Sequence, residues 1–168
     1  MIGRREFLAA LAAFAAVPGS RQYTIQAFRL KDAHELPKLR RSLADAELVL
    51  QAIVAPHLPE LLAIYAGPPG RSPNFRLQAP GRAMLGDVKT LASRDIVELR
   101  SYDRAAPPAC VLRRCGIIPA FTAPDAHLIA FDSLAARERA WAALAADRDW
   151  SRIRSEFRLS GVALYRAS

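Results

Sequence analysis

The order of segments between residues 95 and 166 constrains the fold of this chain more than any other feature. Two strand-like segments flank a proline-containing connection, a third follows a short turn, and an Ala-rich helical segment leads to a last strand. The third strand and the helix form the stretch HLIAFDSLAARERAWAALAADRDW at 127–150. This order predicts a ferredoxin-like α+β fold, in which helices cover one face of an antiparallel sheet.

Apolar patterning gives the bounds of these elements. We predict strands at residues 95–102, 117–122, 126–132 and 161–166. Ser133 is placed to cap the helix, because its hydroxyl can accept a hydrogen bond from an otherwise unpaired amide. Along that helix, one face is predicted to carry Leu134, Trp141 and Leu144, and a second apolar stripe to carry Trp150, Ile153 and Phe157.

A fainter version of the same plan precedes this segment. Residues 24–28 align with 98–102, and residues 61–67 align with 127–133, with Tyr65 opposite Phe131. The order of the matches is preserved along the chain, which is typical of an internal repeat. The predicted elements here are strands at 23–30, 49–55 and 61–66, and a helix at 35–46 with Pro37 in its first turn.

The segment between the two halves is rich in Pro and Gly. Residues 67–82 are predicted to be a loop, and residues 84–93 one or two helical turns. We therefore expect two tandem halves, at 21–66 and 95–168, of which the first is degenerate, joined by a linker at 67–94.

Residues 1–20 have the layout of a secretory signal. Arg4 and Arg5 precede an Ala/Leu/Phe run that reaches Val17, and small residues follow. The paired arginines, with Phe7 two positions later, favour a twin-arginine signal. The run is shorter than the about 20 apolar residues that a membrane span needs. We expect export to the periplasm with no membrane span after cleavage; a cytoplasmic protein with an amphipathic start is the alternative.

The net charge of +8 does not indicate a nucleic-acid partner. Of the 24 basic residues only three are lysines, and the arginines are scattered through the whole chain. A surface that binds nucleic acid usually gathers basic side chains on one face and interleaves aromatic residues for stacking. We expect no nucleic-acid partner.

The chain has two cysteines, Cys110 and Cys115, in the stretch CVLRRCG. An oxidising compartment would allow a disulfide between them, although a bridge across so short a loop adds little stability. The spacing fits neither a C-x-x-C redox centre nor a zinc knuckle. A local disulfide and two free thiols both stay open, and we predict no metal site.

Three stretches carry a resemblance to a known family. They are VELRSYD at 97–103, HLIAFDSLAARERAWAALAADRDW at 127–150 and GVALYR at 161–166. The series Ser-Leu-Ala-x-Arg, then Trp, then Asp-x-x-Trp is the most recognisable part. On these residues the second half resembles the NIPSNAP domain, a member of the dimeric α/β-barrel superfamily.

The chain also departs from the pattern of that family. The connection after the Glu-Leu-Arg-x-Tyr strand is short and proline-broken, where family members carry a helix. The first half has Thr-Ile-Gln-Ala-Phe in place of that strand motif and lacks the Ser-Leu-Ala helix. The resemblance implies a barrel, closed either by two molecules in a homodimer or by the two halves of one chain.

Strand alternation sorts the candidate site residues into faces. Val97 and Leu99 share one face of their strand, and we expect that face to lie under the helices. The opposite, polar face would then line the barrel interior, with residues of the neighbouring strand beside it. The predicted pocket-lining residues are Glu98, Arg100, Tyr102, His127 and Phe131.

Each of these residues also has a structural role open to it. Glu98 and Arg100 can pair across the sheet, and Tyr102 can pack its ring while its hydroxyl stays wet. A histidine near a carboxylate is a general base or an axial heme ligand in functional settings. His57 and His34 fall in predicted turns, where we expect them to be exposed.

No metalloprotease, α/β-hydrolase, phosphate-loop or dinucleotide motif occurs in the sequence. We therefore predict no cofactor, and no catalytic residue is identified. The first hypothesis is an exported NIPSNAP-like barrel that binds a small apolar or aromatic molecule, or a partner. The second is an enzyme resembling cofactor-free monooxygenases. The third is heme binding through His127 or His57.

Overall fold

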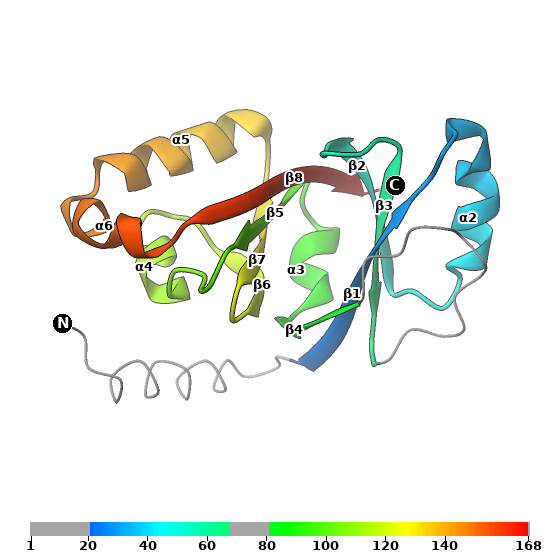
Figure 1. The fold of residues 1–168 in the computed structure, drawn as a ribbon, viewed down its shortest axis with the longest axis horizontal. Helices are drawn as coiled ribbons and strands as arrows, with labels where there is room; N and C mark the ends of the chain where they lie inside the picture. Colours follow the sequence, from blue (N-terminus) through cyan, green and yellow to red (C-terminus); the bar gives the residue numbers. More distant parts are fainter. Residues whose placement is uncertain (1–20, 68–80, 168) are drawn as a thin grey trace.

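The computed structural model describes residues 21–67 and 81–167, and within them an antiparallel sheet closes into a barrel (Figure 1). The strand order around the barrel is β1-β3-β2-β8-β5-β7-β6-β4. The strands are β1 (Arg21–Arg29), β2 (Leu48–Val54), β3 (Glu60–Tyr65), β4 (Arg82–Gly86), β5 (Ile96–Tyr102), β6 (Pro119–Ala123), β7 (Ala126–Phe131) and β8 (Leu159–Ala167). The predicted α+β class with an antiparallel sheet is confirmed.

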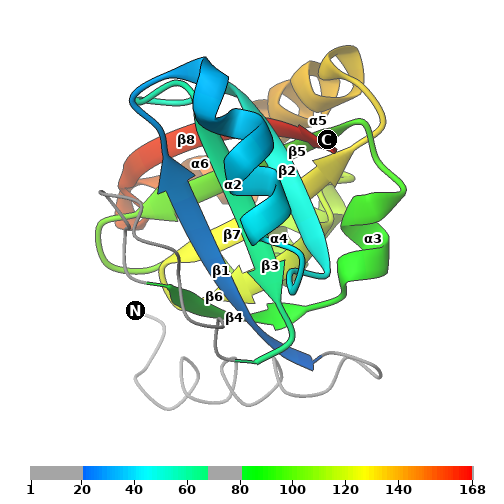
Figure 2. The same ribbon diagram turned by 90° about the vertical axis from the view of Figure 1, so that its right-hand side faces the viewer.

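Helices cover the barrel on two opposite sides (Figures 1 and 2). On one side lies α2, and on the other lie α4, α5 and α6. The helices are α2 (Leu36–Ser42), α3 (Val88–Ala92), α4 (Ala109–Arg114), α5 (Leu134–Ala146) and α6 (Arg148–Ile153), with 3-10 turns at Ala33–Glu35 and Arg154–Glu156. None of the helices in the described part of the chain is long and apolar enough to cross a membrane.

Both halves of the barrel follow the same strand order. It is β4-β1-β3-β2 in the first half and β8-β5-β7-β6 in the second. The halves join where β2 pairs with β8 and β4 pairs with β6. A single chain therefore closes the barrel, and closure needs no second copy.

The register of the strands corrects the predicted alignment of the halves. Thr24 pairs with Tyr65, and Ile96 pairs with Phe131. If Tyr65 corresponds to Phe131, as predicted, Thr24 corresponds to Ile96 rather than to Glu98. The shift is two residues, so it preserves the face on which each side chain lies.

The predicted linker at 67–94 contains regular structure that the sequence patterning missed. Residues 82–86 form β4, where one or two helical turns were predicted over 84–93, and only Val88–Ala92 is helical. A Cβ at Gly86 would lie 2.3 Å from the Ala120 carbonyl oxygen and 2.5 Å from the Phe121 ring. Glycine is therefore required where β4 approaches β6, and a five-residue strand ending in glycine gives little periodicity to detect.

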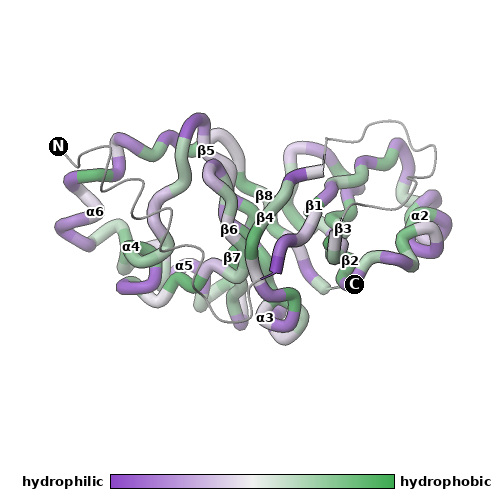
Figure 3. Tube along the Cα trace, turned by 90° about the horizontal axis from the view of Figure 1, so that it is seen from below, coloured by the Kyte–Doolittle hydropathy of each residue, from purple (hydrophilic) through white to green (hydrophobic). Residues whose placement is uncertain are grey.

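The core has three parts, one inside the barrel and two outside it. Hydrophobic residues run along the strands, and hydrophilic residues gather on α2 and α6 (Figure 3). Inside are residues such as Ile25, Leu50, Leu62, Ile64, Met84, Val97, Phe121 and Leu128. Between α2 and the sheet, the cluster contains Phe28, Leu39, Leu43, Leu61 and Tyr65, of which Leu39 and Leu43 come from the helix and its C-cap. Between the sheet and α4 and α5, the cluster contains Ile96, Ile129 and Phe131 from strands, with Leu112 from α4 and Leu144 from α5.

The helix of the second half begins as the sequence predicts. The Ser133 hydroxyl accepts a hydrogen bond from the Ala136 amide at 3.1 Å. Leu144 is buried and Trp141 packs beside it, but Leu134 is 46% exposed, so the prediction that it joins this face is wrong.

The connection after β5 holds more structure than a proline-broken crossover suggests. Pro108 is the N-cap residue of α4, where its missing amide costs no hydrogen bond. Cys110 and Cys115 lie on and just after this helix, and both are free thiols in the structure. Because the two cysteines are five positions apart, their side chains point to different sides of the helix and do not face one another.

Candidate functional site

The polar face of β5 lies against the helices and not in the barrel interior. Ile96 of β5 and its partner Phe131 of β7 belong to the same buried cluster as Leu144 of α5, whereas Val97 belongs to the interior cluster. The grouping by alternation was right, but the prediction that Glu98 and its neighbours line the interior is wrong. The reason is that α5 supplies buried polar partners, which the strand alone cannot show.

Glu98 is fully buried and is held by three side chains. Arg137 of α5 donates from Nε to Oε2 at 2.7 Å and from Nη2 to Oε1 at 3.3 Å. The Trp141 indole donates to Oε2 at 2.9 Å. Arg100, two residues along the strand, donates to Oε1 at 2.5 Å. A buried carboxylate needs this kind of pairing, because an isolated buried charge is strongly unfavourable.

Arg100 completes this cluster by stacking. Its guanidinium carbon lies 3.4 Å from the centroid of the Trp141 ring, a cation–π contact. Arg137 and Trp141 are one helical turn apart and so share a face of α5. The motif residues of β5 and of α5 therefore meet in one buried network, which fastens the helix to the sheet.

His127 and Tyr102 lie side by side at the end of the same face, with ring centroids 6.3 Å apart. His127 is 1% exposed, and its Nε2 lies 2.7 Å from the carbonyl oxygen of Pro107. Its Nδ1 has no hydrogen-bond partner among the described residues. Burial lowers the pKa of the His127 imidazole. A neutral ring with Nε2–H donating to Pro107 fits these observations.

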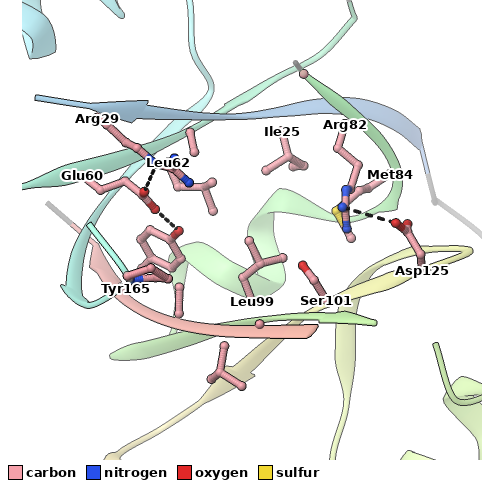
Figure 4. Close-up of a pocket in the computed structure, with 16 residues that line it drawn as sticks. Ile25, Arg29, Glu60, Leu62, Arg82, Met84, Leu99, Ser101, Asp125 and Tyr165 are labelled. Carbon is pink, nitrogen blue, oxygen red and sulfur yellow. Dashed lines mark hydrogen bonds and ion pairs between the residues drawn. The ribbon is translucent and has the colours of Figure 1, made fainter. Parts of the chain in front are cut away.

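A cavity of about 570 Å³ opens at one end of the barrel, away from all five predicted pocket residues. Its walls come from strand ends that meet there: the ends of β1 and β5, and the starts of β3, β4 and β8 (Figure 4). The lining residues are Ile25, Ala27, Arg29, Pro56, Glu60, Leu62, Gly81, Arg82, Met84, Leu99, Ser101, Asp125, Gly161, Val162, Ala163 and Tyr165.

The opposite end of the barrel is filled by side chains. There α3 joins the end of β4 to the start of β5, and its Leu91 is fully buried in the interior cluster. Tyr23 and Phe121 pack edge-to-face in that cluster, with ring centroids 5.2 Å apart. Among the described residues, buried side chains therefore occupy this end of the barrel interior.

One wall of the cavity carries a buried carboxylate with two partners. Glu60 is 3% exposed, and its Oε2 accepts from Arg29 Nε at 3.1 Å. Its Oε1 accepts from the Tyr165 hydroxyl at 2.5 Å. Burial raises the pKa of the Tyr165 phenol, and the bond to Glu60 and its negative charge raise it further. The phenol is therefore neutral and donates to the carboxylate.

The other wall carries a second ion pair. Arg82 Nη2 lies 3.3 Å from Asp125 Oδ2, and the guanidinium points into the cavity (Figure 4). Arg82 Nη1 is buried and has no partner among the described residues. Between the two walls the lining is apolar, with Ile25 and Leu99 labelled in the same view.

Sequence reasoning missed both walls of this cavity. Glu60 is the first residue of β3 and its only charged residue, and every residue of this strand is buried. An acidic residue in such a position requires a partner, which is the signal that could have been used. Its partners Arg29 and Tyr165 come from 31 and 105 residues away, so no spacing in the sequence links them.

The described residues offer no cluster of three His, Cys, Asp or Glu that could hold a metal ion. The residues present also do not fit the predicted heme ligation in the cavity. His127 is buried on the outer face, and His57 and His34 are exposed in the turns where they were expected. No histidine among the described residues lines the cavity.

Comparison with known proteins gives one match. No curated protein and no solved structure matches the chain significantly. The family model NIPSNAP matches residues 125–163, the segment that contains β7, α5, α6 and the first part of β8. This segment, which supplies Arg137 and Trp141 to Glu98, is therefore similar to the NIPSNAP family.

Proposed function

We propose that this protein binds a small, largely apolar molecule in the open end of its barrel. The observation that carries the proposal is the cavity itself, about 570 Å³ with apolar walls and two pre-paired polar groups. Small-molecule sites are typically concave spaces of about 300–1,000 Å³, mostly apolar, with a few placed polar groups.

The polar groups of the cavity are held ready before any ligand arrives. Glu60 is fixed by Arg29 and Tyr165, and Arg82 is oriented by Asp125 (Figure 4). Groups that are already ordered lose little conformational entropy on binding, which favours affinity. At the opposite end, Leu91 of α3 is buried in the interior cluster, which leaves the open end as the entrance we propose for the ligand.

We further propose that the whole chain is a NIPSNAP-like barrel whose first half is a degenerate copy of the second. Support comes from the family match over 125–163 and from the common strand order of the halves. The first half keeps the strands but has α2 as its only covering helix among the described residues. The homodimer expected from the resemblance stays a prediction, to be checked by sedimentation.

A reaction in the cavity is the second candidate. A cofactor-free monooxygenase-like step needs an acid–base group facing the substrate, and the cavity supplies the Glu60–Tyr165 pair in place of the predicted His127. Product formation from a bound aromatic substrate in air, lost in Glu60→Gln, would support this candidate. Binding without turnover would leave the binding function alone.

Export is a proposal from the sequence. Residues 1–20 lie outside the described residues, so the support is the Arg4-Arg5 pair and the apolar run behind it. Cell fractionation of the full chain tests it, with Arg4→Lys/Arg5→Lys as the comparison. Protein in the periplasm, lost in the double variant, is expected; equal cytoplasmic retention of both forms contradicts it.

Binding can be tested with N-phenyl-1-naphthylamine, a neutral apolar fluorophore that brightens in apolar surroundings. We expect its emission to rise and saturate at about one probe per chain. Ala163→Phe fills the cavity and should abolish the rise, and Ala27→Leu should weaken it if Ala163→Phe fails to fold. Ala142→Phe on the exposed face of α5 is the matched control. An unsaturable rise, or one that Ala163→Phe leaves intact, contradicts the proposal.

A further inference from the structure

The charges that line the cavity balance one another. Two basic side chains, Arg29 and Arg82, face two acidic ones, Glu60 and Asp125, and each acid is paired with a base. Tyr165 is a neutral donor to Glu60. A ligand with a net charge would lose its hydration and find no uncompensated opposite charge in the cavity. The balance therefore favours a neutral ligand.

One hydrogen-bond donor in this balanced set is unused. Arg82 Nη2 forms an ion pair with Asp125 Oδ2 at 3.3 Å, while its Nη1 is buried and without a partner among the described residues. A buried donor without an acceptor costs free energy, which a ligand oxygen would recover on binding. The guanidinium points into the cavity above Ser101, with the apolar wall beside it (Figure 4).

Resting on the proposed binding function, we infer that the cavity selects a neutral, largely apolar molecule bearing a carbonyl oxygen, and that the Arg82 guanidinium, which faces the cavity, turns its buried Nη1 toward that oxygen and donates to it. A carbonyl accepts without carrying charge, so it satisfies the donor and keeps the balance with Asp125. A carboxylate would also accept, but it would lie next to the carboxylate of Asp125 and add a negative charge. A hydrocarbon would fill the space and leave the donor unsatisfied.

Three naphthalenes of similar size test this choice. They are 2-acetylnaphthalene, 2-isopropylnaphthalene and 2-naphthoate, each used to displace N-phenyl-1-naphthylamine. We expect the ketone to bind about tenfold more tightly than the hydrocarbon, the effect of one hydrogen bond to a charged donor. The carboxylate is expected to bind more weakly than the ketone.

Variants of Arg82 assign the preference to one side chain. Arg82→Met should weaken ketone binding about tenfold and leave the hydrocarbon unchanged. Arg94→Met is the matched control, because Arg94 also pairs with an aspartate and is equally exposed, 37%, on a surface outside the cavity lining. If Arg82→Met does not fold, Arg82→Lys is the second variant. It keeps the charge but replaces the two Nη nitrogens by one ammonium nitrogen, which pairing with Asp125 draws away from the ketone, so the preference should fall too.

The outcomes separate this inference from the binding function. Equal affinities of ketone and hydrocarbon, tighter binding of the carboxylate, or an equal loss for both probes in Arg82→Met would overturn the carbonyl assignment. In those cases a saturable fluorophore signal that Ala163→Phe abolishes still supports binding in the cavity. If neither the fluorophore nor the ketone binds, by fluorescence or calorimetry, both are overturned.

Discussion

Arg137 on α5 donates hydrogen bonds to both carboxylate oxygens of Glu98 on β5, from Nε at 2.7 Å and from Nη2 at 3.3 Å. The two residues are 39 positions apart in the chain. Glu98 is fully buried, and the side chain of Arg137 is only 20% exposed. Arginine holds a carboxylate in a fixed two-pronged geometry, which sets both the distance and the rotation of the helix over the sheet. In the segment that is similar to the NIPSNAP family, Arg137 and Trp141 thus have a structural role, because they hold α5 on the sheet through Glu98.

Removing the carboxylate should therefore cost stability rather than function. Glu98→Ala leaves the largely buried Arg100 and Arg137 without their acceptor, and we expect a loss of about 3 kcal/mol in the free energy of unfolding. Urea denaturation measures it. Asp132→Ala, which removes an exposed partner of Arg94, is the control and should cost less than about 1 kcal/mol. Equal losses in the two variants would contradict a buried network.

The Trp141 side chain makes two separate contacts in this network, a hydrogen bond to Glu98 and a cation–π contact with Arg100. Trp141→Phe keeps an aromatic face under Arg100 but removes the indole donor to Glu98. A hydrogen bond to a charged group is worth about 1.5–3 kcal/mol, so we expect a loss in that range by chemical denaturation. Trp141→Leu should lose more, because the stacking goes as well. If Phe and Leu are equivalent, the ring face contributes nothing.

His127 should make the fold sensitive to mild acid. Burial lowers its pKa in the folded state, so protons bind more tightly to the unfolded chain, where the pKa is about 6.5. Its contribution is complete above about pH 6.5 and is lost as the pH falls toward the folded pKa. Denaturation curves from pH 7.5 to 5 measure the slope.

Two substitutions isolate this effect. His127→Gln can still donate to the Pro107 carbonyl but does not titrate, so its acid slope should be shallower than that of the unsubstituted protein. His57→Gln alters an exposed ring and should leave the slope unchanged. An unchanged slope in His127→Gln would remove His127 as the source.

Tyr165 in the cavity should make the fold sensitive to alkaline rather than acidic pH. The pKa of Tyr165 is raised by burial and by Glu60, so the unfolded chain loses its phenolic proton first. Its contribution is complete below about pH 10, the ordinary pKa of tyrosine, and is lost as the pH rises above it. Tyr165→Phe should cost about 1.5–3 kcal/mol at pH 7.

The same variant should fall in stability less steeply than the unsubstituted protein above pH 10, as followed by denaturation between pH 9 and 11.5. The other tyrosines, Tyr23, Tyr65 and Tyr102, also have raised pKa values, so some alkaline slope will persist. An identical slope in Tyr165→Phe would show that its phenol has an ordinary pKa in the folded state.

By itself, the sequence determined the strands and the long helix of the second half, though not α4, and the pairs of faces on its strands. Period-two alternation groups Ile96 with Glu98 and Val97 with Leu99 whichever way the sheet turns, and the Ser133 cap depends only on neighbours three residues away. The elements of the first half could also be predicted, except for β4. That strand has only five residues and ends in glycine, so its alternation of apolar and polar residues is too short to recognise.

Which face points inward was decided only by the tertiary structure. That choice depends on what each face meets: Glu98 finds Arg137 and Trp141 on α5, while Leu99 meets the open barrel. The cavity likewise joins Glu60 to Tyr165 across 105 residues. A charged side chain can be buried only where it is paired and hydrogen-bonded. Closure of the barrel and docking of α5 bring the partners of Glu60 and Glu98 within hydrogen-bond distance.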